Sequence, residues 1–202
     1  MIKGLVKEGT VRWSGEHWIS YLRRPGENSD TGMVSLYNMR YTEAGHGFVA
    51  FVVIHEDDGP GFKGMCTTNR DVADFMFDEA TRHASHPPYD EKLPVMEATF
   101  IQGGHVADNP SWTISTGDHE IVASWSQIQP VVIAAGPWPD AEPTNYVCSL
   151  LHFTDESSIR LDGRAIEGKP YLRDIWRPTI GGDRSSCVFA LSESLMTVKG
   201  ES

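Results

Sequence analysis

The chain has 202 residues, a mass of 22.4 kDa and a formal net charge of −11. Nucleic acids and anionic membranes attract a basic face, so this excess of carboxylates predicts neither as a partner. Apolar residues make up 40% and charged residues 22% of the chain, a balance typical of folded globular proteins rather than disordered ones. We expect one domain over residues 1–202.

The first residues, Met1 to Glu8, contain neither an apolar stretch nor a small-residue cleavage site, so we expect no signal peptide. The three cysteines, Cys66, Cys148 and Cys187, form no Cys-x-x-Cys pair. Their odd number predicts reduced thiols and a cytoplasmic location of bacterial type. Cys148 and Cys187 lie in apolar runs, where cysteine behaves as a small buried hydrophobe.

In chain order, residues 16–23 predict a short helix that Pro25 ends. Residues 34–41 and 48–55 are rich in β-branched and aromatic side chains and predict a hairpin. Residues 71–84 place apolar side chains at helical spacing, with Thr68 and Asp71 as the start signal and Pro87-Pro88 as the stop. This helix is the one clear interruption of a strand-rich pattern.

The second half predicts strands again, over residues 95–102, 111–115 and 119–126, the last two around Gly117-Asp118. Residues 146–153 form a nearly continuous apolar strand that we expect to be buried on both faces. Asp162-Gly163 is a two-residue hairpin signal, and a last strand begins near residue 186. The fold class predicted is mainly β, a single antiparallel barrel or sandwich with one inserted helix near 71–84.

Three segments of the second half carry a family resemblance: 112–114 (WTI), 121–125 (IVASW) and 158–164 (SIRLDGR). They resemble the closing strands of lipocalin-like barrels of the carotenoid-hydratase and AttH-like type. The resemblance covers residues 110–199 and transfers no catalytic residue. It implies a lipocalin-like barrel with a cavity for a small, largely apolar molecule.

Five residues are candidates for proton transfer, because they are polar groups in strand patterns or in loops at a barrel rim. Glu97 would have a raised pKa if it faced the interior, and otherwise it is a plain surface carboxylate. His105 could be oriented by Asp108, or it belongs to an ordinary turn. His152 is a cavity residue or a core histidine, His55 ends a strand at a barrel mouth, and Tyr37 is a hydroxyl donor.

Four further residues are candidates for ligand binding. Trp125 would form a cavity wall, because its strand carries small polar neighbours on the other face. Arg40 would bind an acidic group if it faced inward. Phe51 and Tyr146 would line the cavity, with core packing as the alternative for Phe51.

The spacing of histidines, cysteines and acids fits no metal site, so we expect no metal and no organic cofactor. The leading hypothesis is a cofactor-independent enzyme that acts on a small apolar or aromatic metabolite by general acid–base chemistry, as a hydratase, dehydratase, isomerase or other lyase. The alternative is a non-catalytic carrier of a small hydrophobic ligand. A barrel that is simply filled is the third possibility. A homodimer is possible, because Tyr171 to Pro178 combines aromatic residues with arginine in a lid or interface segment.

Overall fold

Strands dominate the computed structural model of the protein, which describes residues 8–55, 61–83, 93–137 and 145–198. The first half contains β1 (Gly9–Arg23), β2 (Asp30–Thr42), β3 (Gly45–Ile54), β4 (Phe62–Thr67), α1 (Arg70–His83), β5 (Val95–Glu97) and β6 (Thr99–Gly103). The second half contains β7 (Ser111–Ser115), β8 (Glu120–Ile128), β9 (Val132–Pro137), β10 (Asn145–Leu161), β11 (Arg164–Ala165), β12 (Leu172–Arg173), α2 (Arg177–Ile180), β13 (Arg184–Ser185) and β14 (Val188–Val198), with a 3₁₀ turn at Asp174–Trp176.

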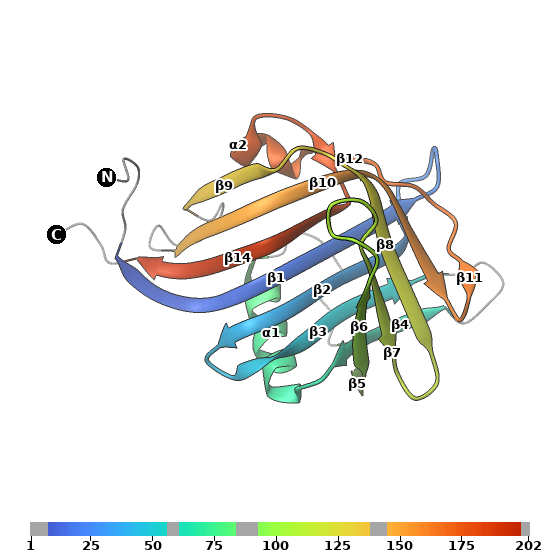
Figure 1. Ribbon diagram of the computed structural model, residues 1–202, viewed down its shortest axis with the longest axis horizontal. Helices are drawn as coiled ribbons and strands as arrows, with labels where there is room; N and C mark the ends of the chain where they lie inside the picture. Colours follow the sequence, from blue (N-terminus) through green and yellow to red (C-terminus); the bar gives the residue numbers. More distant parts are fainter. Residues whose placement is uncertain (1–7, 56–60, 84–92, 138–144, 199–202) are drawn as a thin grey trace.

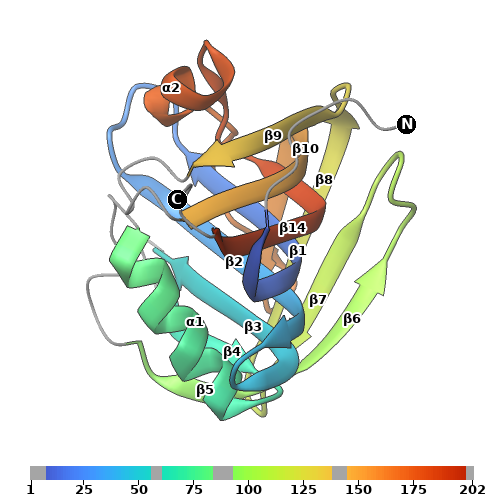
Figure 2. The same cartoon turned by 90° about the vertical axis from the view of Figure 1, so that its left-hand side faces the viewer.

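Most strands form one strongly curved sheet that nearly closes into a barrel (Figures 1 and 2). Its neighbours run in the order β5-β4-β3-β2-β1-β14-β10-β8-β7-β6, and β9 and β11 also pair with β10. Within the described chain no ladder joins β5 to β6, so one seam stays unsealed. The prediction of a mainly β, barrel-like fold with one long helix is confirmed.

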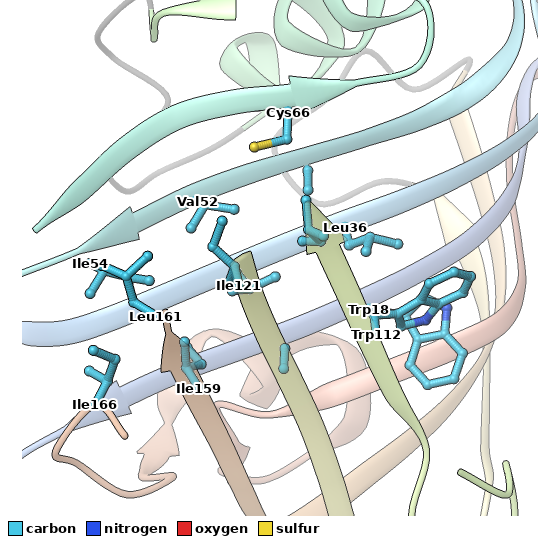
Figure 3. Packing of buried hydrophobic residues seen from close by; sticks show 14 of the residues in the cluster. Trp18, Leu36, Val52, Ile54, Cys66, Trp112, Ile121, Ile159, Leu161 and Ile166 are labelled. Atoms are coloured by element: carbon cyan, nitrogen blue, oxygen red, sulfur yellow. The ribbon is translucent and has the colours of Figure 1, made fainter. Parts of the chain in front are cut away.

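Apolar side chains fill the concave inner face of the sheet. Figure 3 shows aliphatic residues, among them Ile54, Ile159 and Leu161, at one end of this inner core, and Trp18 and Trp112 at the other. The strands alternate, so one set of side chains reaches this core and the other set points outward. An aliphatic end and an aromatic end therefore divide the barrel interior.

Helix α1 covers the outer face of β3 and β4, where Val72 and Met76 pack against Phe51 and Met65 (Figure 2). β2 has the inner core on one side and this outer core on the other, so every residue from 31 to 39 is buried. Two covered faces explain why β2 and β3 read as nearly continuous apolar runs.

The predicted hairpins are present. β2 pairs with β3, and β7 pairs with β8 around Gly117-Asp118. At the β10–β11 turn, Asp162 has φ 52° and Gly163 has φ 78°, as a two-residue turn of the predicted type requires.

Helix α1 begins where expected, but a different side chain caps it. The Asp71 amide donates to the Asn69 side-chain oxygen at 3.1 Å, whereas the Thr68 hydroxyl accepts from the Phe48 amide. The predicted end of the helix at Ala84 and its Pro87-Pro88 stop lie outside the described residues.

Two expectations were wrong, one about a helix and one about the burial of a strand. Residues 16–23 form part of β1 rather than a helix, because their alternation is of period two: Trp18 and Ser20 face inward while Ile19 and Tyr21 face outward. The first half of β10 is buried on one side only, so Cys148 is exposed rather than buried.

Candidate functional site

A stack of aromatic rings occupies one end of the inner core. Trp18, Phe189 and His152 are register neighbours on β1, β14 and β10. The Phe189 ring stacks on Trp18 at 4.4 Å between centroids and on His152 at 4.9 Å. Partial burial lowers the pKa of His152, so the neutral imidazole is favoured.

A second aromatic group closes this end from the other side of the barrel. Trp112 on β7 makes an edge contact with Trp18 at 6.0 Å, and Phe48 on β3 stacks on Phe100 of β6 at 5.0 Å. Phe48 also packs against Trp112. We refer to Trp18, Phe48, Phe100, Trp112, His152 and Phe189 as the aromatic end.

A carboxylate stands at the rim of the aromatic end. Glu16 accepts hydrogen bonds from the Trp18 indole at 3.2 Å, from the Asn38 amide at 3.1 Å and from Arg40 at 3.2 Å. The Glu16 side chain is 16% exposed and Arg40 is 71% exposed, so the charge pair lies at the boundary with solvent. This arrangement presents a polar edge beside stacked rings.

The three interior tryptophans differ in how their indole N–H groups are satisfied. Trp18 donates to Glu16, and Trp125 donates to the Ile19 carbonyl at 2.8 Å. Trp112 is 3% exposed, and its indole nitrogen has no partner within the described parts of the chain. A buried donor without an acceptor costs about 1–3 kcal/mol, so this N–H needs an explanation.

An exposed apolar surface continues from the aromatic end. Leu150 lies two residues before His152 on the same side of β10, and its register partner on β9 is Ile133. Leu191 follows Phe189 on β14, at the register shift between Ala190 and Glu193. Ile133 is 72% exposed, while Leu150 and Leu191 are 38% and 37% exposed. We call these three residues the apolar shelf.

A separate polar network lies on the outer face of the sheet. His17 Nδ1 is 3.1 Å from a Glu193 carboxylate oxygen, and His17 Nε2 is 3.0 Å from the Ser35 hydroxyl. The Ser149 hydroxyl donates to the other Glu193 oxygen at 2.8 Å. Tyr37 stacks on the His17 ring with centroids 3.9 Å apart.

The surroundings of the buried Glu193 carboxyl favour its charged form. Burial alone raises the pKa of this carboxyl, but the hydrogen bond and the charge of His17, together with the Ser149 hydroxyl, hold the pKa below its ordinary value. Register shifts in the β1–β14 and β10–β14 ladders coincide with this residue, and they turn its side chain outward. Ser35 is only 1% exposed, so the Ser35–His17–Glu193 arrangement does not present an accessible nucleophile.

The structure places the predicted residues in three groups. The inner face holds His152 and Trp125, and Arg40 lies at its rim; Tyr146 is half-buried on the same side of β10 as His152. Tyr37 and Phe51 are both buried on the outer face, with ring centroids 6.1 Å apart.

The third group is exposed and dispersed. Glu97 ends β5, His55 follows β3, and His105 lies in the loop between β6 and β7. The His105 ring accepts a hydrogen bond from the Ala107 amide at 3.3 Å rather than pairing with Asp108. Among the described residues, no hydrogen bond or ring contact joins any two of these three side chains.

Sequence reasoning missed Glu16, Trp112, His17 and Glu193. The interpretation of residues 16–23 as helical concealed the first and third, because only strand alternation sends Glu16 and His17 to opposite faces. Trp112 could have been noticed from its alternation with Ile114 in a short strand. No local signal marks Glu193, whose direction depends on a bulge.

Over the described ranges, no cluster of three or more histidine, cysteine or acidic side chains could hold a metal ion. Neither of the described helices combines the length and apolar character needed to span a bilayer. Comparison of the sequence with protein-family models and with curated proteins finds no match, so the site is interpreted from its own geometry.

Proposed function

We propose that the chain binds a small, flat, largely apolar molecule at the aromatic end of its barrel. The observation that carries this proposal is the buried Trp112 indole N–H, which has no acceptor among the described residues, whereas the indoles of Trp18 and Trp125 both have one. A ligand with a carbonyl, carboxylate or sulfonate oxygen would supply that acceptor.

The surroundings support a ligand of this kind. Stacked rings favour a planar partner, and the exposed apolar shelf offers contact area outside the core. The Glu16–Arg40 pair at the rim would orient a polar group of the ligand. Binding without conversion is the function best supported, because Glu97, His105 and His55 are exposed and dispersed.

The test uses the planar aromatic sulfonate 1-anilinonaphthalene-8-sulfonate as a fluorescent probe. We expect Trp112→Phe to weaken its binding about fivefold, the equivalent of one hydrogen bond. Trp13→Phe is the matched control, because Trp13 is also buried but packs in the outer core, away from the aromatic end. Equal affinity of the two variants, or no binding by the parent chain, would refute the proposal and favour a filled barrel.

A second pair of variants tests the apolar shelf. Ile133→Ser should weaken probe binding, while Ile101→Ser should leave it unchanged. Ile101 is the matched control because it is 64% exposed on β6 but points away from the inner core. A loss in both variants would mean that the probe binds any exposed apolar side chain.

Acid–base catalysis at the same place is the second proposed function. It rests on His152, the one histidine among the predicted proton carriers that belongs to the aromatic end, and whose neutral form is favoured by burial. Incubating candidate hydroxylated or unsaturated aromatic compounds in heavy water, with detection of deuterium uptake by NMR, is the test. Exchange that persists in His152→Gln would exclude this role.

A further inference from the structure

The short ribbon β12–β13 places two arginines against each other. Arg173 and Arg184 are register partners, so their side chains leave the ribbon on the same side. Directly opposed like charges on neighbouring strands are destabilising. Neither guanidinium forms an ion pair with any described residue, although the chain as a whole is strongly acidic.

Aromatic faces hold both guanidiniums in place. Arg173 lies 4.7 Å above the Tyr21 ring, and Arg184 lies 6.0 Å from the centre of the Phe153 ring. Both rings belong to the outer face of the sheet. Stacking of this kind fixes the orientation of a guanidinium without neutralising its charge.

Donors at this place outnumber acceptors. Arg184 Nε is buried and has no partner in the part of the chain that the structure describes. The same holds for the indole nitrogen of Trp176, whose ring packs on the same Phe153 at 5.2 Å. Asp183, next to Arg184, is held by Arg177 through both carboxylate oxygens, and the exposed Asp174, next to Arg173, forms no ion pair with it. Two guanidiniums and the Trp176 indole N–H therefore lie on Phe153 and Tyr21, and none of the three groups has a hydrogen-bond acceptor among the described residues.

We propose that Arg173 and Arg184, with the Trp176 indole, form a binding site for an oxyanion, either a phosphate group or a carboxylate. An oxyanion would relieve the repulsion between the two arginines and accept from the buried Arg184 N–H. The site lies on the outer face, apart from the aromatic end inside the barrel, so it is independent of the function proposed above.

The experiment measures the thermal unfolding midpoint of the full chain against increasing inorganic phosphate, with sodium chloride of equal ionic strength as reference. We expect the midpoint to rise with the logarithm of phosphate concentration, because a ligand that binds only the folded state stabilises it. Sodium acetate replaces phosphate in a second arm. A rise with either anion supports the oxyanion site and identifies the preferred group, whereas a rise with neither overturns the proposal.

Variants distinguish this site from a general salt effect. Arg184→Gln should weaken the anion affinity by about tenfold or more, the equivalent of a charge-assisted hydrogen bond. Arg160→Gln removes the same charge from an exposed position on β10 and should leave the response unchanged. An equal response of the two variants overturns the proposal. If Arg184→Gln does not fold, Arg173→Gln serves the same comparison.

Discussion

Replacing Glu193 by alanine should cost about 3 kcal/mol of folding stability. The carboxylate holds His17 at 3.1 Å and Ser149 at 2.8 Å, and its side chain is 9% exposed. Removing one partner of a buried charged pair typically costs 3–5 kcal/mol, because the remaining polar groups lose their partner. The His17 side chain is 14% exposed, so water can replace part of the lost interaction, and we expect the lower end of this range.

Urea unfolding followed by tryptophan fluorescence near neutral pH measures this loss. Glu156→Ala is the matched control, because Glu156 is exposed on β10, and it should change stability by less than about 0.5 kcal/mol. A loss below about 1 kcal/mol for Glu193→Ala would refute the reasoning, because it would mean that the network contributes no more than a surface pair.

The same residue predicts a pH dependence. The pKa of Glu193 is lower in the folded chain than in the unfolded one, where an ordinary glutamate has a pKa of about 4.3. Its contribution is therefore fully present above that pH and is lost as the pH falls through the folded pKa. Glu193→Gln should show a shallower loss of stability with acid than the parent chain. A steeper loss would contradict the assigned direction.

Thiol chemistry and backbone geometry give two more tests. Cys148 is exposed, whereas Cys66 and Cys187 are buried, and burial raises the pKa of Cys66 to about 12. An aromatic disulfide reagent should therefore label one thiol quickly in the native chain, and all three thiols only after unfolding. Gly104→Ala should cost at least about 2 kcal/mol, because φ is 69° and the new Cβ would lie 1.9 Å from the Asn109 carbonyl oxygen. Gly163→Ala, at φ 78° with open space around it, should cost only about 1 kcal/mol, and equal losses would contradict the steric argument.

Local sequence signals were sufficient for much of the fold. The helical spacing around Phe75 and Met76 and the turn chemistry of Asp162-Gly163 are properties of adjacent residues, so both were predictable. Residues 16–23 failed because a short run with few β-branched side chains fits either period. Pairing with β2 and β14 on either side stabilises the strand conformation of these residues.

The candidate site was less accessible to prediction. Trp112 and His152 belong to the aromatic end, with Glu16 at its rim, only because β7, β10 and β1 surround one inner core, and no spacing in the sequence encodes that closure. Glu193 reaches the outer face only because of a bulge in β14. Beyond a bulge, the alternation of residues assigns each side chain to the wrong face of the sheet. Contacts between residues more than a hundred positions apart, as between His17 and Glu193, depend on topology.

The unsealed seam of the barrel is held by side-chain contacts where a backbone ladder is missing from the described chain. β5 and β6 are separated only by Ala98, whose amide donates to Thr67, so the chain itself joins the two sides of the seam at that corner. Away from the corner, the stacked rings of Phe48 and Phe100 bridge β3 and β6 in place of a backbone ladder. Phe48 also packs against Trp112 of β7, so among the described residues ring contacts, rather than a backbone ladder, join β3 to the β6–β7 hairpin. Separating β3 from β6 at the aromatic end would break side-chain contacts, whereas the β6–β7 and β7–β8 ladders hold the hairpin to the rest of the sheet.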